Sequence, residues 1–418
     1  MIDYDVCIIG AGIAGLYCAR ELSKAWPDAR ICIMEKSRFL GGRVSSFRTI
    51  IPEIGRVQWE AGAGRIHKSH TQVLNLVKQY KLTLIPISEG IDWRSDTLSY
   101  PEPIEFSRYI ESIGISQISP SILQKTTLRN VLEKTIGSRK TKELTDRYEY
   151  RSEIDTLRAD KAINALTHEL GHTTGFFTIK QGFSALVEAL YNDIRKKGVK
   201  VLKEREVIDI HKSRDAYRLN IRNHVSIQAS KVVVAVPRNA VALIPCFKNL
   251  PILKQVAMQP LVRMYAIFPK VNNHMWFEGL RKFICPGHIR YVIPINPKDG
   301  LIMISYTDGK DAEYWIRRLK DGEASIIDEV MKEIRDIFPV LNIPDPIYFK
   351  IHPWMDGCSY WVPGTYDFDR VSNDSVIPLP REMPEVYMCN ESWAYNQAWV
   401  ECSIDQAKHA VNTILERK

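Results

Sequence analysis

The sequence has no long apolar run, no paired cysteine spacing and no concentrated basic segment. No apolar run approaches the roughly 20 residues that a membrane-spanning helix needs. The eight cysteines form no C-x-x-C pair and no zinc-type spacing, which argues against a disulfide framework and against a metal site. The net charge of +8 is spread along the chain, so nucleic-acid binding is not indicated either.

Length and composition are those of a globular protein with a large core. The chain has 418 residues, which suits two intertwined domains at the usual ~100–200 residues each. Hydrophobic residues make up 45% and charged residues 25%, so neither a disordered nor a fibrous chain is expected. The first β-prone run begins at Tyr4, which leaves no room for a secretory or transit peptide before it. We therefore expect a soluble, cytoplasmic protein.

A strand, a glycine turn and a helix open the chain. β-prone residues run from Tyr4 to Ile9, and Ala14–Trp26 carries apolar residues at helical spacing. A second β-prone run, Ala29–Met34, is followed by Glu35 and completes a β-α-β unit of about 30 residues. Such a unit is typical of dinucleotide-binding folds.

The turn Gly10-Ala11-Gly12-Ile13-Ala14-Gly15 fits the pattern G-x-G-x-x-G. Gly10 permits the tight turn, Gly12 lets the backbone approach a pyrophosphate, and Gly15 lets the helix pack closely on the strand. The phosphates would bind the free N–H groups at the positive end of the helix. Glu35 lies 20 residues after Gly15, where a carboxylate can accept the ribose hydroxyls of an adenosine. A purely structural glycine turn is the alternative, but strand, helix and acid all stand where the dinucleotide pattern needs them.

The rest of the chain mixes helical and β-prone segments. Helices are expected at Thr71–Lys81, Ser121–Gly171, Gly182–Lys197, Ala312–Ile337 and Ala398–Glu416. Strands are expected at Val201–Ile210, Tyr217–Arg222, Val225–Ala229, Val232–Val236, Arg263–Phe268, Arg290–Ile295, Leu301–Tyr306 and Val386–Cys389. The run at 232–236 has the continuous apolar character of a buried parallel strand.

Several separated motifs carry a family resemblance. Gly41-Gly42-Arg43 follows the ribose acid, and the other matching segments are Glu60–Arg65, Asn390–Ser392 and Ala398–Glu401. With these motifs the chain resembles the flavin-containing amine oxidase family, which includes monoamine, polyamine and L-amino acid oxidases. The resemblance covers most of the chain except roughly residues 85–170.

The resemblance implies FAD as the cofactor and an α/β fold, and we expect the FAD to be bound non-covalently, although some relatives attach it through a cysteine. A Rossmann-type FAD-binding domain (1–85, 175–250 and 380–418) would be interleaved with a substrate domain of mixed sheet and helices (86–174 and 251–379). The implied cofactor contacts are Gly10, Gly12, Ala14, Gly15, Glu35, Lys36, Gly42, Arg43, Gly62, Ala63, Gly64, Arg65, Val207, Glu391, Trp399 and Val400. Cys358 is the candidate for a covalent flavin link, but no cation lies close to it in sequence to lower its thiol pKa.

The chain departs from the family at several positions. Family members usually have glycine where this chain has Asn390, Ala398 and Cys402, so the flavin loop could be tighter or shifted. They commonly place a lysine, linked through water to the reactive flavin nitrogen, where this chain has Arg263. Arginine cannot act as a base, although it could order a water or stabilise negative charge. The alternative is a surface arginine at the start of a strand.

The family passes a hydride equivalent from the carbon beside an amine to the flavin, and dioxygen then yields hydrogen peroxide. This chemistry needs a dry pocket with aromatic walls, for which Trp399, Tyr306 and Tyr360 are the candidates. Arg65 resembles the arginine that binds the substrate carboxylate in L-amino acid oxidases, because a guanidinium offers two parallel donors. A phosphate or an internal acid is the alternative partner. We count Arg65, Trp399, Arg263, Tyr306 and Tyr360 as the candidate catalytic residues.

Other functions remain open from the sequence. Arg263 would be unremarkable in an FAD-dependent desaturase or a porphyrinogen-type dehydrogenase, but the charged helical region at 121–171 argues against a membrane-embedded substrate. A non-catalytic FAD-binding protein is a further alternative. The expected partners are a small amine or amino acid and dioxygen, without nucleic acid or membrane, and a homodimer is one arrangement to test.

Overall fold

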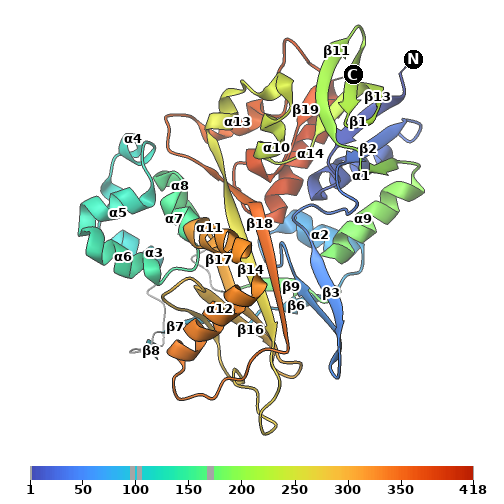
Figure 1. The fold of residues 1–418 in the computed structure, drawn as a ribbon. Coiled ribbons are helices and arrows are strands. Elements are labelled where there is room, and N and C mark those ends of the chain that lie inside the picture. Colours follow the sequence, from blue (N-terminus) through green and yellow to red (C-terminus); the bar gives the residue numbers. More distant parts are fainter. Residues whose placement is uncertain (1, 95–98, 101–105, 167–173, 418) are drawn as a thin grey trace.

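The computed structural model describes residues 2–94, 99–100, 106–166 and 174–417. Two large sheets dominate the molecule, with a group of short helices at one side (Figure 1). Strands from the beginning, middle and end of the chain meet in the first sheet. This arrangement brings the early and late sequence motifs together.

The first sheet has the strand order β10-β2-β1-β13-β12-β11, and β19 pairs with β13. Its inner pairs are parallel, whereas β11, β12 and β13 form an antiparallel meander. The strands are β1 (Tyr4–Ile9), β2 (Ile31–Glu35), β10 (Lys200–Lys203), β11 (Val207–Ser213), β12 (Ala216–Ile221), β13 (His224–Val234) and β19 (Val386–Met388). Ile8 and Ile9 lie on opposite faces of the sheet, and both are buried. This is what a parallel sheet covered on both faces requires.

Helices cover one face of this sheet. They are α1 (Ile13–Ala25), α9 (Ser184–Lys196) and α14 (Val400–Glu416), with α2 (Thr71–Gln79) packed beside α14. Figure 1 shows α14 and the first strands at the same end of the molecule. The last long helix thus completes the layer that the first helix begins.

The second sheet has the order β18-β14-β17-β16-β15-β7-β8. Its strands are β7 (Ile91–Arg94), β8 (Ser99–Tyr100), β14 (Val256–Ile267), β15 (Lys282–Ile284), β16 (Tyr291–Asn296), β17 (Leu301–Asp308) and β18 (Tyr348–Trp361). Helices α11 (Gly309–Arg318) and α12 (Glu323–Ile337) pack on one face with a separate apolar core. The other face, with Tyr265, Tyr291 and Tyr306, joins the main core that also reaches the first sheet.

The remaining elements are two small sheets and a set of short helices outside the two large sheets. A hairpin joins β3 (Ser46–Ile51) to β4 (Gly55–Glu60), and a small sheet contains β5 (Ile66–His67), β6 (Leu84–Pro86) and β9 (Phe176–Ile179). The short helices at the side are α3 (Phe106–Ser112), α4 (Pro120–Leu123), α5 (Leu128–Ile136), α6 (Ser138–Asp146), α7 (Arg151–Asp155) and α8 (Ala159–Asn164). Helices α10 (Arg238–Ala242) and α13 (Phe368–Asp374) follow β13 and β18. In the described part of the chain, no helix combines the length and the apolar character needed to cross a bilayer.

Most expected elements are confirmed, and some boundaries are corrected. The expected strand Val201–Ile210 is wrong, because it breaks at Glu204, whose φ of 56° is left-handed. The expected helix Ala312–Ile337 is also wrong as one element, because Gly322 at φ 92° separates α11 from α12. The strands expected at 225–229 and 232–236 are continuous in β13, and the long strand β18 was not expected. The region expected to be helical from 121 to 171 is helical but not one helix: up to residue 166 it consists of the separate helices α4 to α8, and 167–171 lie outside the described residues.

Candidate functional site

Two of the three glycines in the turn after β1 are required by the fold itself. Gly10 has φ 99°, and a Cβ there would lie 2.8 Å from the carbonyl oxygen of Ala235. A Cβ on Gly15 would overlap the carbonyl oxygen of Gly10. Replacement of either glycine would therefore disturb the contact between α1 and the sheet.

Gly12 is different, because nothing in the protein requires a glycine there. Its φ is −72°, and a Cβ on it would meet no atom within 4 Å. Gly12 is the N-cap of α1, no side chain caps this helix end, and the first turn, which includes Ala14, holds no acid. The open space over Gly12 and the uncapped N–H groups fit a pyrophosphate. Gly42, at φ 58°, lies on the other side of this space. A Cβ built on Gly42 would lie 3.7 Å from the Gly12 Cα.

Glu35 stands at the end of β2 beside this turn. One carboxylate oxygen accepts the N–H of Ala11 at 2.8 Å and the other accepts the N–H of Ser37 at 2.8 Å. Each oxygen keeps a lone pair for a ribose hydroxyl. Val207 begins β11 and is buried, and the N–H of Arg205 bonds to the Glu35 carbonyl at 2.9 Å. Lys36 is exposed.

Arg43 and Glu391 join the early and late motifs. An ion pair of 2.8 Å links them, and Arg43 also donates to the Gly357 carbonyl at 3.3 Å and to Asn390 Oδ1 at 3.2 Å. Glu391 is 3% exposed and accepts hydrogen bonds from the Ser359 N–H, the Ser359 hydroxyl and the Ala398 N–H. Both carboxylate oxygens thus have protein partners, so Glu391 fixes the path of the closing loop. Its contact with a cofactor stays a prediction.

The positions where the family usually has glycine behave differently from one another. Asn390 has φ 174°, an extended conformation that any residue adopts, whereas Ala398 has φ 68° in the left-handed region. Ala398 therefore carries a backbone strain that glycine would not. Cys402 is buried in the first turns of α14. Glu401, beside it, accepts the N–H groups of Gln72 and Val73 at 2.8 Å each, so it caps α2.

The loop after β4 contacts the second sheet through Arg263. A Cβ on Gly62 would overlap the Arg43 carbonyl, and a Cβ on Gly64 would lie 3.4 Å from Arg263 Nη1, which shows how closely these segments pack. Arg263 is 7% exposed in the middle of β14 and donates to the carbonyls of Gly62 and Glu60. It is not a surface arginine at a strand start. Its guanidinium lies 4.6 Å from the ring centre of Tyr306.

Glu60 places a carboxyl group just ahead of this glycine loop. Burial raises its pKa to about 7, while hydrogen bonds from the Ser46 hydroxyl (2.8 Å) and the Phe183 N–H (3.1 Å) favour the charged form. Sequence analysis did not single out Glu60 for this property.

Arg65 lies in an aromatic cage. Its guanidinium is 5.4 Å from the ring centre of Tyr150, 5.3 Å from that of Phe176 and 5.6 Å from that of Trp399, and it hydrogen-bonds the Tyr150 hydroxyl. Within the described ranges none of the ion pairs includes Arg65. No described carboxylate therefore lies within 4 Å of this guanidinium. Sequence analysis missed Tyr150 and Phe176, which come from distant segments without a recognisable local pattern.

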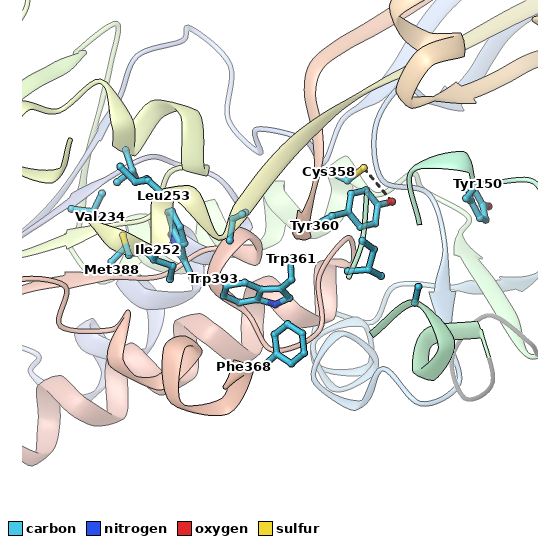
Figure 2. Packing of buried hydrophobic residues seen from close by; sticks show 14 of the residues in the cluster. Tyr150, Val234, Ile252, Leu253, Cys358, Tyr360, Trp361, Phe368, Met388 and Trp393 are labelled. Atoms are coloured by element: carbon cyan, nitrogen blue, oxygen red, sulfur yellow. Dashed lines mark hydrogen bonds between the residues drawn. The ribbon is translucent and has the colours of Figure 1, made fainter. Parts of the chain in front are cut away.

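Each of the three expected aromatic walls has its own set of neighbours. Tyr306 packs edge-on to Tyr150 at 5.8 Å and lies under Arg263. Tyr360 belongs to the cluster in Figure 2, where its hydroxyl accepts a hydrogen bond from Cys358 Sγ at 3.6 Å. Trp399 is the N-cap of α14, directly ahead of Val400, and stacks on Phe176 at 6.0 Å.

Two cavities border Trp399. The larger, about 520 Å³, is lined by polar side chains from the loop before α2, from α13 and from α14. The smaller, about 40 Å³, is lined by Glu153, Tyr360, Trp361 and Trp399 among others. His70 lines the larger cavity and packs edge-on to Trp399 at 4.9 Å. Burial lowers the pKa of His70 to about 4, so its imidazole is uncharged at neutral pH.

A family model of flavin-containing amine oxidoreductases matches residues 13–415. The chain belongs to this family. Membership confirms the resemblance drawn from the motifs and implies a flavin cofactor, which agrees with the open space over Gly12. The family assignment and the two-sheet architecture also confirm the expected fold class. The domain boundaries and the individual contacts expected for the cofactor stay predictions.

The chain is also similar to several known proteins. An uncharacterised protein of Acanthamoeba polyphaga mimivirus is 30% identical over 116 residues, which span 28% of this chain and only 22% of the viral protein. A double mutant of putrescine oxidase superposes with a TM-score of 0.75 at 15% identity over 100% of both chains. A protein from Exiguobacterium sp. 255-15, provisionally named protoporphyrinogen oxidase, gives 0.75 at 17% identity, also over 100% of both chains. At these identities the structures share the fold alone.

Proposed function

We propose that this flavin-containing amine oxidoreductase oxidises the α-amino group of an L-amino acid. The observation that carries the proposal is the environment of Arg65, whose guanidinium has three aromatic neighbours, one tyrosine hydroxyl and no carboxylate partner in the described chain. A half-buried guanidinium with spare donors suits a planar carboxylate, which can form two parallel hydrogen bonds with it. Simple amines offer no such group.

In the proposed reaction the chain's own residues bind, orient and shield the substrate. Arg65 would hold the carboxylate, while Trp399 and Tyr360 would form apolar walls that exclude water. Arg263 stays protonated, so it cannot accept the proton of the substrate ammonium. Its fixed charge would instead stabilise negative charge that develops beside the loop from Gly62 to Gly64.

Gly12 and the N-terminus of α1 would hold the pyrophosphate of FAD, and Glu35 would hold its ribose. The bound flavin would supply the two-electron oxidation of the substrate α-carbon, with dioxygen as the final acceptor. The substrate becomes an imino acid and dioxygen becomes hydrogen peroxide. Hydrolysis of the imine then gives ammonia and a 2-oxo acid. The cofactor supplies the redox chemistry and the protein supplies geometry and electrostatics.

We propose that the FAD is held without a covalent bond. Cys358 is 6% exposed, burial raises its thiol pKa far above the ordinary value, and its thiol donates to Tyr360. A thiol in this state is a poor nucleophile. Acid precipitation of the purified protein should leave the yellow colour in the supernatant, and colour in the pellet would contradict the proposal.

The deciding experiment compares Arg65→Ala and Arg65→Lys with the wild type. Arg65→Ala should lower kcat/KM for the best amino acid by about one to three decades, because loss of one partner of a desolvated charge pair costs about 2–5 kcal/mol. Flavin content should be unchanged, and Arg65→Lys should recover little because an ammonium lacks the planar fork. Peroxide formation from amines, with none from any amino acid, would refute the assignment.

A dehydrogenase of the porphyrinogen type is the second candidate. It is favoured by Arg263 at the position where the family commonly has lysine, and a fold neighbour carries that provisional name. Against it stands the charged surface of the side helices: α6, for example, contains Arg139, Lys140, Lys142 and Glu143 in exposed positions. A panel of amino acids, amines and a porphyrinogen separates the two candidates by peroxide release. We further propose that the enzyme is cytoplasmic and that it forms a homodimer. Sedimentation of the purified protein would test the homodimer.

A further inference from the structure

A buried lysine in the second sheet has no charged partner. Lys282 begins β15 and is 8% exposed. In the described part of the chain its ammonium forms no ion pair and no hydrogen bond. Lysine is almost never buried without a partner, so the surroundings of Lys282 need an explanation.

The strand register directs Lys282 toward the face of the sheet that carries the tyrosines. Lys282 stands opposite Ile91 of β7, and Ile284, two residues further along β15, stands opposite Tyr291. All three of these neighbours belong to the main core, which also contains Tyr306. The residue between Lys282 and Ile284 packs instead into the separate core under α11 and α12. Because side chains alternate along a strand, Lys282 faces the same side as Tyr291 and Tyr306.

The acid on the neighbouring strand does not neutralise Lys282. Asp92 of β7 stands opposite Phe283, so its side chain lies on the other face of the sheet. Asp92 already pairs with Arg281 at 3.1 Å and with Arg94 at 3.6 Å. The positive charge of Lys282 is therefore left on the tyrosine face.

Lys282, Arg65 and Glu149 act on one another. Burial and, second, the charge of Arg65 lower the pKa of Lys282 to about 8, while Glu149 opposes this shift. Burial raises the pKa of Glu149, while its own backbone N–H and the charges of Arg65 and Lys282 oppose the rise. The other charged groups that act on Lys282 are Arg281 and Glu89.

Positive charge exceeds negative charge beside the aromatic cage. Arg263 lies over Tyr306, which packs against the cage, and none of Arg65, Arg263 and Lys282 takes part in an ion pair among the described residues. At pH 7 Lys282 is mostly protonated, so three cations stand here against the carboxylate of Glu149. Such a region attracts an anion and repels a cation.

We infer that Lys282 is a second cation of the carboxylate site, which strengthens the binding of a substrate carboxylate to Arg65 and selects against basic substrates. The inference rests on the proposed function, because it uses Arg65 for the α-carboxylate. Lys282 needs no contact with the substrate, because a charge in a poorly solvated site acts beyond its contact distance. The substrates are then amino acids with neutral or acidic side chains.

Binding of hexanoate to the FAD-loaded protein isolates this effect, because hexanoate carries a carboxylate and no amine. Calorimetry in the wild type should show a Kd that rises about three- to thirtyfold from pH 7 to pH 9, as Lys282 loses its proton. Lys282→Met should bind hexanoate weakly at both pH values. Lys282→Arg should bind it tightly at both, because arginine keeps its charge. A merely structural role would not give these two opposite pH profiles.

Two controls and one further measurement sharpen the test. Lys298→Met, at an exposed position, should follow the wild type, and the neutral analogue hexanamide should bind without this pH dependence. At pH 8 the arriving anion raises the pKa of Lys282, so hexanoate binding should take up protons. Calorimetry in two buffers of different ionisation enthalpy measures this uptake, which should be absent in Lys282→Met.

Substrate preference gives a second readout. L-Glutamine and L-ornithine are similar in length and differ in the charge of the side chain. Peroxide release in the wild type should show a higher kcat/KM for glutamine, and Lys282→Met should narrow the difference. A wild type that prefers ornithine would overturn the selection against basic substrates.

The outcomes separate this inference from the proposed function. Hexanoate that binds equally well to Arg65→Ala would overturn the carboxylate assignment itself. Hexanoate that needs Arg65 but binds the wild type equally at pH 7 and pH 9 would overturn only the role of Lys282. A pH dependence that persists in Lys282→Arg and disappears in Glu149→Gln would assign the effect to Glu149 and likewise overturn it.

Discussion

Arg43 and Glu391 form an ion pair of 2.8 Å that ties the loop after β2 to the segment after β19. The carboxylate is nearly inaccessible, with 5% of its side chain exposed, while the arginine keeps 24%. The pair therefore does more than connect two motifs. It fixes the closing loop, because Glu391 also holds the Ala398 N–H at 2.8 Å.

Arg43→Met should be strongly destabilising. The change leaves the Glu391 charge buried with only neutral donors, a situation that costs about 3–5 kcal/mol. Urea unfolding of the flavin-free protein, followed by tryptophan fluorescence, measures the loss. The double variant Arg43→Met/Glu391→Gln should recover part of the stability, and a double variant less stable than the single one would contradict this account.

Gly12→Ala should fold normally but lose its flavin. The new methyl group meets no protein atom, so the stability of the flavin-free protein should change by less than about 1 kcal/mol. Absorption of bound flavin should fall well below one equivalent, because the methyl group occupies the space proposed for the pyrophosphate. Gly15→Ala is the matched control: it should fail to fold. A yellow Gly12→Ala protein would show that the space is not used in this way.

Ala398→Gly should stabilise the flavin-free protein. Ala398 has φ 68°, and removal of its Cβ relieves roughly 1 kcal/mol of strain, partly offset by the greater freedom of glycine in the unfolded chain. The urea midpoint should rise slightly. Asn390→Gly, at φ 174°, has no strain to relieve and should lower the midpoint. A loss of stability in Ala398→Gly as large as in Asn390→Gly would contradict this explanation.

Glu60 should make stability fall with pH. Its pKa is about 7 in the folded protein against an ordinary 4.5, so the folded state binds the proton more tightly than the unfolded state. The contribution is fully present below about pH 4.5 and is lost as the pH rises to 7. In Glu60→Gln the stability should fall less steeply over this range, because other buried acids such as Glu153 also have raised pKa values and keep part of the dependence. Urea midpoints from pH 5 to 8 would reveal the difference. Glu188→Gln, at an exposed position, should follow the wild type.

The sequence predicted the parts of the site that have local signals. Gly10, Gly15 and Glu35 are recognisable because their spacing follows from one β-α-β unit. Arg65 was found by its place in a motif, but its neighbours Tyr150 and Phe176 were not, since they meet it only after separate segments fold together. The helix cap that Glu401 provides for α2 escaped notice for the same reason. Contacts between distant segments leave no periodic trace in sequence.

The position of β19 and α14 also bears on how the protein is made. β19 pairs in parallel with β13, and α14 packs against α1, so the first sheet is complete only after the last of its strands has been added. During synthesis the N-terminal β-α-β unit leaves the ribosome long before these partners exist. Apolar side chains of α1 such as Leu16 and Leu22 are fully buried in the folded protein. Until α14 is made, these side chains must stay exposed to solvent or be covered by another protein. The nascent chain is therefore a candidate client for chaperones until its final helix docks.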